Sequence, residues 1–305
     1  MTNVSQQKTI NLSLCLLDNF YRYLQVERDR SPKTIKDYQI VLKDFCCILN
    51  ITSDNELLAI TPMQISEWLE VLNKKQYSVN SKNTKIACLK SFYHFLEDYD
   101  YIQKSPMKRV KTYKERNYKE ITFLNESQVK MFLSKCKNIR DRAIFTMLFT
   151  MGLRSSEIIN IQINNLYLAD APYLIVRCKG NKELKKPIPN IVVPLISEYI
   201  SAFRDKKFPN SKHGNLFLSN QGTPINPKSL NFTCKNIAKR ANLGLDIHVH
   251  SCRHSFASNQ LKKGASIKEV QENLGHQSML TTANIYTHIS LDDKTESINK
   301  YNFDL

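Results

Sequence analysis

The stretch that decides the fold is "RDRAIFTMLFTMGLRSSE", residues 140–157 of a chain of 305 residues. Its apolar run suits a buried core helix, and it is far shorter than the ~18 residues that a membrane span needs. Gly152 is a typical helix stop, and the segment from Ser155 starts another helix. The sequence therefore predicts a core helix that ends at a polar corner holding Arg154.

The corner around Arg154 is suited to binding an anion. The backbone N–H groups at the start of the following helix favour negative charge, and a guanidinium contacts phosphate through two parallel hydrogen bonds. Ser155 and Ser156 are candidate caps for that helix, and Glu157 is placed to orient the guanidinium of Arg154. Taken alone, such an arginine is more often a surface or cap residue.

A short sheet and further helices follow the corner. The run 172–189 is rich in β-branched residues and contains Gly180 and Asn181, which predicts a β-hairpin with Lys179 at its tip. Beyond it we expect helices over about 192–205, 227–241, 252–263, 266–274 and 279–287. This part of the chain is predicted to be mainly α with one small antiparallel sheet.

The part before the corner is predicted to be entirely helical. "SPKTIKDYQIVLKDFCCIL", residues 31–49, has Ser31 as N-cap and Pro32 at the first helical position, and Thr61 with Pro62 repeats this arrangement. Apolar residues at three- and four-residue steps mark helices over about 12–24, 32–49, 62–72 and 81–98. We therefore divide the chain into a helical domain (1–103), a basic linker (104–121) and a second domain (122–305).

Composition points to a polyanionic partner. The chain has 44 Lys and Arg against 28 Asp and Glu, a net charge of +16, which favours nucleic acid. We expect no membrane association, because no apolar run is long enough to span and no export signal is recognisable, so a cytoplasmic protein is expected. Lys82, Lys85 and Lys90 lie off the apolar stripe of their helix, on a face that is either merely solvated or turned to DNA.

Cofactors are not expected. The eight cysteines form no C-x-x-C pair, so free thiols are favoured over a zinc site. His248, His250 and His254 hint at metal ligands, but no carboxylate or thiol pattern supports them. The sequence also has no phosphate-binding G-x-x-x-x-G-K-S/T and no G-x-G-x-x-G.

Metal-free cleavage of DNA requires a nucleophile, several cations around the phosphate and an acid for the leaving oxygen. "HVHSCRHSFAS" supplies His250 and Arg253, three apart and thus on one helical face. His276 follows Gly275 at a helix stop, and Tyr286 comes ten residues later. Each residue alone has an ordinary structural explanation, and most helical tyrosines serve packing. The evidence for a function is the occurrence of all these residues together, in this order along the chain.

That ordered set resembles the tyrosine recombinase, or phage integrase, family, in its Xer-like and mobile-element integrase branch. The matching residues, in chain order, are Arg154, Lys179, His250, Arg253, His276 and Tyr286. Segments 31–45 and 85–107 also resemble that family's SAM-like, helical core-binding domain. The resemblance implies a two-domain clamp around DNA, with 122–305 as the catalytic domain.

The resemblance also implies a role for each residue. Tyr286 would attack the scissile phosphate and form a 3′-phosphotyrosine. Arg154 and Arg253 would bind the non-bridging oxygens, and His250 and His276 would hydrogen-bond the phosphate, with His250 helping to deprotonate the tyrosine. Lys179 would protonate the 5′-oxygen. Neither metal nor ATP would be needed, because the covalent link conserves the energy of the phosphodiester.

The resemblance implies that the partner is double-stranded DNA carrying specific recombination sites. It also implies a homo-tetramer that assembles on two duplexes and exchanges strands through a Holliday junction. Accessory proteins are further candidate partners, and the expected location is the bacterial nucleoid. The ten-residue step to Tyr286, and Cys252 where Xer proteins have leucine, favour integration, excision or resolution of a mobile element. The alternatives are a Xer-type chromosome-dimer resolvase, a type IB topoisomerase, or a DNA-binding regulator without catalysis.

Overall fold

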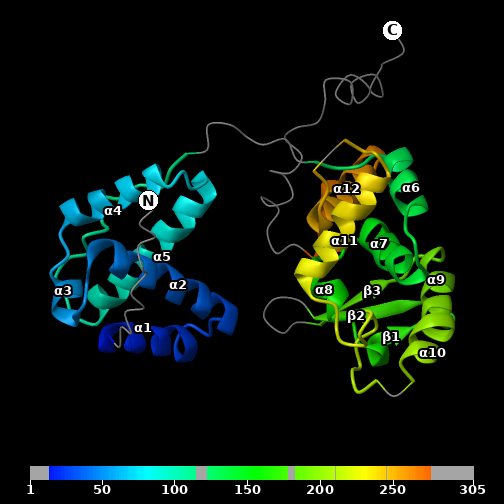
Figure 1. Ribbon diagram of the computed structural model, residues 1–305, viewed down its shortest axis with the longest axis horizontal. Helices are drawn as coiled ribbons and strands as arrows, with labels where there is room; N and C mark the ends of the chain where they lie inside the picture. Colours follow the sequence, from blue (N-terminus) through cyan, green and yellow to red (C-terminus); the bar gives the residue numbers. More distant parts are fainter. Residues whose placement is uncertain (1–13, 115–121, 178–182, 210, 245, 276–305) are drawn as a thin grey trace, which may run out of the picture. The chain divides into compact units, whose positions relative to one another are not determined.

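The computed structural model describes residues 14–114, 122–177, 183–209, 211–244 and 246–275 (Figure 1). The chain divides into two compact units, Met1–Tyr118 and Lys119–Leu305. Each unit has its own cluster of buried apolar side chains. Within the described residues, no helix combines the length and the apolar character that crossing a membrane requires.

The first unit is entirely helical in its described part, as predicted. Its helices are α1 (Cys15–Val26), α2 (Pro32–Leu49), α3 (Asp54–Leu58), α4 (Pro62–Lys74) and α5 (Val79–Asp98). The Ser31 hydroxyl accepts the backbone N–H of Thr34 at 3.2 Å, as an N-cap should. The short helix α3 was not predicted, because five residues are too few to show a helical period.

Helix α5 contributes more buried residues to this unit's core than any other of its described helices. Ile86, Leu89, Tyr93 and Leu96, which recur at three- and four-residue steps, are all fully buried. Trp68 of α4 is also fully buried and packs edge to face on Phe45, with ring centroids 5.6 Å apart.

The lysines on the outer side of α5 are held by neighbouring helices. Lys85 Nζ lies 2.7 Å from the carboxylate of Asp44 on α2, and Lys82 Nζ donates to Asn73 Oδ1 at 2.7 Å. Both side chains also lie over tyrosine rings. Their ammonium groups are therefore placed by specific partners rather than extended freely into solvent.

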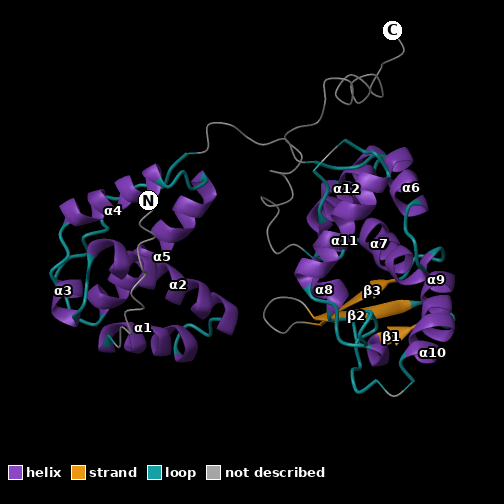
Figure 2. Ribbon diagram, in the orientation of Figure 1, coloured by secondary structure: helices purple, strands orange, loops and turns teal. Residues whose placement is uncertain are grey.

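The second unit combines helices with one small sheet, which confirms the predicted fold class (Figure 2). The described strands are β1 (Leu166–Tyr167), β2 (Tyr173–Arg177) and β3 (Glu183–Pro187), antiparallel in the order β1-β2-β3, with Leu174 opposite Lys186. The helices are α6 (Glu126–Ser134), α7 (Ile139–Met151), α8 (Ser155–Ile159), α9 (Val192–Glu198), α10 (Asp205–Lys207), α11 (Pro227–Arg240), α12 (Val249–Lys262) and α13 (Ile267–Leu274).

Helix α7 is the predicted buried core helix. From Ala143 to Phe149 every residue is buried, and α6, α9 and α12 pack against it (Figure 1). It ends at Gly152, whose φ is +60°, the left-handed conformation in which glycine avoids the Cβ penalty. Burial on all sides of this helix fits its position at the centre of the unit.

Of two predictions around the corner after α7, one was confirmed and one was wrong. A helix does begin at Ser155, the short α8, and a 3₁₀ turn (Ile163–Asn165) then leads into β1, a strand of two residues that no alternation could reveal. Ser155 and Ser156 lie inside α8 and do not cap it, because Arg154 occupies the N-cap position. There, Glu157 supplies the capping carboxylate and accepts the Arg154 backbone N–H at 2.8 Å.

Two later helices also differ from prediction. The helix expected over 192–205 changes to a π-helical segment, Tyr199–Arg204, which ends at a buried arginine bound to the carbonyl of His213 at 2.9 Å. Helix α12 begins at Val249, earlier than the predicted 252, so His250 lies within its first turn. The earlier start of α12 has a local cause, a capping box in which the Ser251 side chain accepts the backbone N–H of His248 at 3.4 Å. The hydrogen bond of Arg204 to His213 is a contact outside the helix that local periodicity does not contain.

Candidate active site

Two helices that are far apart in the sequence end side by side, and the candidate site is built there. Helix α7 ends at Gly152 and α13 ends at Gly275, both in the left-handed conformation with φ of +60° and +64°. A Cβ added to Gly152 would lie 2.9 Å from Cδ2 of Leu274, the last residue of α13. The last carbonyls of the two helices, which have no partner inside their own helix, therefore lie close together.

Arg253 of α12 binds both helix ends. Its Nη1 donates to Gly152 O at 2.5 Å and its Nη2 donates to Leu274 O at 2.7 Å. The residue is only 2% exposed, and its Nη1 also lies 3.9 Å from the buried carboxylate of Glu157. A buried charge is tolerated when it is paired and hydrogen-bonded, and these partners satisfy that requirement.

Arg154 shares the same carboxylate. Its Nη1 donates to Glu157 Oε1 at 2.5 Å, so Glu157 orients this guanidinium while it also faces Arg253. Nη2 of Arg154 reaches Gly275 O at 3.4 Å. The side chain of Arg154 is 36% exposed against 3% for that of Arg253. Of the two arginines, Arg154 is thus the more accessible to a ligand in solution.

His250 lies beside these two arginines. Partial removal of its imidazole from water lowers its pKa, and the positive charges of Arg253, His248 and Arg154 lower that pKa further. The neutral imidazole is therefore favoured near pH 7. Its ring meets that of His254 edge to face, with centroids 4.5 Å apart. Over the described ranges, no group of three or more candidate ligands is arranged to hold a metal ion.

The structure thus brings together four of the predicted residues: Arg154, Glu157, His250 and Arg253. Lys179, His276 and Tyr286 lie outside the described residues. His276 directly follows Gly275 in the chain, and the segment containing Lys179 joins β2 to β3. The described chain thus ends at Gly275, whose carbonyl Arg154 contacts, one residue before His276.

Lys186 of β3 was missed by the sequence reasoning. It is 5% exposed, and its Nζ donates to Met151 O of α7 at 3.4 Å and to Asn273 O of α13. A signal was present in the sequence, because Leu184, Lys186 and Ile188 alternate with more polar positions as the inner face of a strand does. A lysine within such a face is rarely buried unless it has partners.

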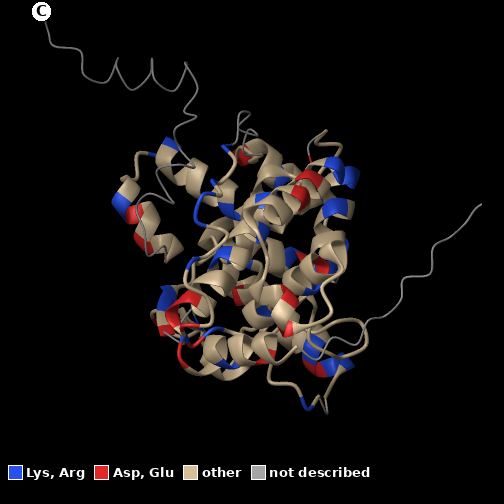
Figure 3. Ribbon diagram, turned by 90° about the vertical axis from the view of Figure 1, so that its left-hand side faces the viewer, with Lys and Arg blue, Asp and Glu red and all other residues tan. Residues whose placement is uncertain are grey.

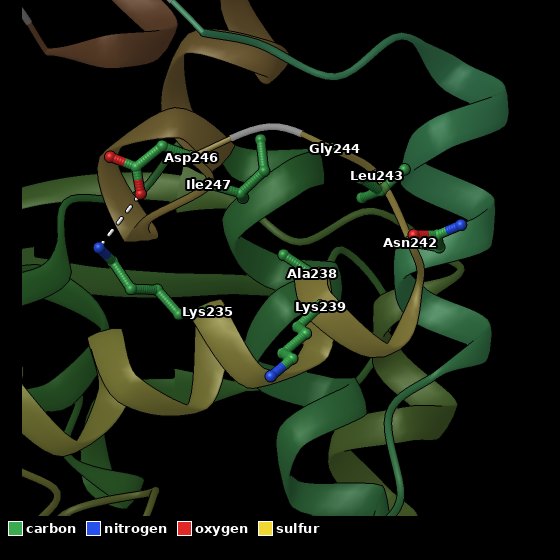
Figure 4. Close-up of a pocket in the computed structure, with 8 residues that line it drawn as sticks. All are labelled: Lys235, Ala238, Lys239, Asn242, Leu243, Gly244, Asp246 and Ile247. Atoms are coloured by element: carbon green, nitrogen blue, oxygen red, sulfur yellow. Dashed lines mark ion pairs between the residues drawn. The ribbon is translucent and has the colours of Figure 1, made fainter.

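A separate pocket of about 370 Å³ lies at the C-terminal end of α11 (Figure 4). Lys235 and Asp246 line it and form an ion pair of 3.1 Å. Among the described residues that line this pocket, none belongs to the cluster around Glu157. We therefore do not assign the pocket to the cluster's chemistry.

Comparison with known families accounts for most of the chain. Residues 122–292 match the family described as "Phage integrase family". Residues 17–99 match "Phage integrase, N-terminal SAM-like domain". The two matches fall in the two compact units, one in each.

Full-length relatives are also found. The chain is 30% identical over 292 residues to "Tyrosine recombinase XerC" of Oceanobacillus iheyensis, covering 93% of this chain and 94% of that protein. It is 28% identical over 290 residues to "Tyrosine recombinase XerD" of Staphylococcus saprophyticus, covering 94% and 98%.

Solved structures share the fold. The XerH site-specific recombinase bound to palindromic difH substrate has a TM-score of 0.73 at 21% identity, with 92% of this chain and 84% of that one covered. The Tn1549 transposon integrase in complex with transposon right end DNA has a TM-score of 0.68 at 17% identity, covering 94% and 99%. At these identities the likeness concerns the fold.

Proposed function

The chain belongs to the phage integrase family and is a tyrosine recombinase, and from this premise we propose that it cuts and rejoins DNA at specific sites through Tyr286. The observation that carries the proposal is the cluster at the ends of α7 and α13. Two arginines pair there with one buried carboxylate, Glu157, and His250 lies close enough for both their charges to lower its pKa. Permanent cations gathered at one point are what the transition state of phosphoryl transfer requires.

The two arginines would bind the non-bridging oxygens of the scissile phosphate. Arg154 is the exposed member, and Glu157 holds its guanidinium in one orientation, which reduces the ordering required on binding. Arg253 supplies a second permanent charge from the buried side. Because both pair with the same carboxylate, their separation is set before DNA arrives.

Tyr286 would attack phosphorus, forming a bond from its phenolic oxygen while the bond to the 5′-oxygen breaks. A phenol has a pKa of about 10, so it needs nearby cations or a base to react near neutral pH. His250 is suited to accept the phenolic proton because its lowered pKa keeps the imidazole neutral. Lys179 would give a proton to the departing 5′-oxygen, and His276 would hydrogen-bond the phosphate.

The partner we propose is duplex DNA with specific recombination sites. The net charge of +16 supports this, and Lys and Arg occur along many of the described helices rather than in one segment (Figure 3). We further propose that the two units form a clamp and that four copies assemble on two duplexes and exchange strands through a Holliday junction. Accessory proteins and a location at the nucleoid belong to the same proposal.

Two biological roles are supported by different observations. The ten-residue step from His276 to Tyr286 favours integration, excision or resolution of a mobile element. Similarity to XerC and XerD proteins over nine-tenths of the chain favours a Xer-type resolvase of chromosome dimers. Cleavage of element ends but not of a chromosomal repeat site would select the first role, and the reverse result would select the second.

The nucleophile can be tested with a nicked duplex that traps cleavage, built on a site that the protein selects from a random DNA pool. The wild-type protein is expected to form a covalent adduct that survives a denaturing gel, and Tyr286→Phe is expected to form none while still binding DNA. Tyr167→Phe is the matched control, because this tyrosine lies on β1 and half of its surface remains exposed.

An adduct that persists in Tyr286→Phe would show that another residue is the nucleophile. Tight binding of the wild-type protein to its selected site, with no adduct at any time, would instead support the non-catalytic regulator.

A further inference from the structure

We propose that Lys186 is a positioning residue for strand cleavage, holding together the three chain segments that carry the candidate catalytic residues. The inference rests on the proposed function, but its structural basis is independent of it. Lys186 lies on β3, and its ammonium group donates to Met151 O at the end of α7 and to Asn273 O at the end of α13. It thus connects a strand to two helix ends that are more than 100 residues apart in sequence.

Each of these three attachments lies close in the chain to a candidate catalytic residue. Met151 comes three residues before Arg154, and Asn273 comes three residues before His276. The strand itself follows the segment that contains Lys179. A shift of Lys186 would therefore be passed on to several parts of the site at once.

The carbonyls that Lys186 binds favour a cation. The C-terminal ends of helices carry partial negative charge and unpaired carbonyl groups, and here two such ends lie side by side. Arg253 satisfies Gly152 O and Leu274 O, and Arg154 reaches Gly275 O. Lys186 binds the carbonyl one residue earlier at each end, Met151 O and Asn273 O, so three cations divide these carbonyls among them.

Burial of this lysine indicates that its position is specific. Removing an ammonium from water is costly, and the cost is offset only when good acceptors surround it. A methionine of similar length would fill the same space without that cost. Leu184, two residues earlier and on the same face of β3, lies against Gly275, where an added Cβ would be 3.3 Å from Leu184 Cδ2. The strand therefore meets the end of α13 through two neighbouring side chains.

The test compares Lys186→Met with wild type in single-turnover cleavage of the nicked duplex at saturating DNA. The cleavage rate is expected to fall on the order of 10- to 100-fold, the effect of misplacing reacting groups by about 1 Å, while DNA affinity changes less than about twofold. Lys186→Arg keeps the charge and the donors, and it should recover most of the rate. Lys185→Met is the matched control, because Lys185 is the exposed neighbour whose Nζ lies over the Tyr173 ring.

Hydrogen exchange provides a readout that does not depend on activity. Lys186→Met should speed exchange of the amides at 152–155 and 272–275 while the helices of the first unit keep wild-type protection. If Lys186→Met does not fold, Lys186→Gln takes its place and is read in the same way. Unchanged exchange at both segments, or a folded variant that cleaves at the wild-type rate, overturns the proposal. If the wild-type protein forms no adduct, the proposed function fails and with it the role of Lys186 in cleavage, whereas the exchange data still decide whether Lys186 holds the two helix ends in place.

Discussion

Gly152 stands where the chain leaves the core helix and turns toward Arg154. Its φ of +60° is unfavourable for residues with a Cβ, and an added Cβ would lie 2.4 Å from Cδ1 of Phe256 on α12. Gly244 has nearly the same backbone conformation, with φ of +64°, but nothing lies within 4 Å of an added Cβ. Comparing alanine substitutions at the two glycines therefore separates the free-energy cost of backbone strain from the cost of close packing.

Gly152→Ala is expected to destabilise the second unit by about 2 to 4 kcal/mol, because it adds overpacking to the cost of the left-handed conformation. Gly244→Ala should cost only about 1 kcal/mol, the conformational part alone. Chemical denaturation followed by far-UV circular dichroism measures both variants. Equal losses of stability for the two variants would mean that the Phe256 and Leu274 side chains move aside without an energetic cost.

At the scale of the element, helix boundaries in this protein are set by local hydrogen bonds. Thr61 starts α4 with a capping box, in which its hydroxyl accepts the N–H of Gln64 at 3.3 Å and the Gln64 side chain accepts the Thr61 N–H at 2.9 Å. Asn125 and Gln128 repeat the arrangement at α6. Each pair satisfies donors that a helix leaves unpaired at its first turn.

Thr61→Ala should lower the stability of the first unit by about 1 kcal/mol, the usual cost of losing an N-cap. The chain has a single tryptophan, Trp68, which is buried on the same helix, so its fluorescence follows this unit alone. Thr84→Ala is the control, since Thr84 is an exposed residue inside α5 and alanine favours a helix interior. A loss as large in the control would contradict the role of the cap.

At the scale of the whole molecule, charge is the dominant property. The surplus of Lys and Arg is not consumed by internal ion pairs, although several lysines, such as Lys85 with Asp44, do have acidic partners. The buried Lys and Arg side chains stabilise the fold, whereas the exposed ones supply a positive field that attracts a polyanion.

DNA binding is therefore expected to weaken steeply with salt. A protein that makes about 6 to 10 phosphate contacts loses on the order of 10³- to 10⁵-fold in affinity between 50 and 200 mM salt. Titration of a labelled duplex, followed by fluorescence anisotropy at several salt concentrations, gives the slope. A nearly flat slope would mean that few phosphates are contacted, in conflict with a clamp around the duplex.

The sequence alone was sufficient for features that depend on neighbours in the chain. The helices capped by Ser31 and Thr61, the buried helix ended by Gly152 and the hairpin strands were all predictable, because caps, turns and periodicity act over a few residues. The candidate residues were identified through their order along the chain. The structure brings Arg154, His250 and Arg253 together, and the roles of all six candidate residues, including Lys179, His276 and Tyr286, stay predictions.

Only the tertiary structure decided which groups meet. The hydrogen bond from Arg253 to Gly152 joins residues 101 positions apart, and that from Lys186 to Asn273 joins residues 87 apart. The burial of Lys186, the sharing of Glu157 by two arginines and the two-residue strand β1 all depend on such contacts. No local pattern predicts the hydrogen bonds of Arg253 and Lys186. Their acceptors are backbone carbonyls, which every residue has, and only packing brings a carbonyl within reach of a particular cation.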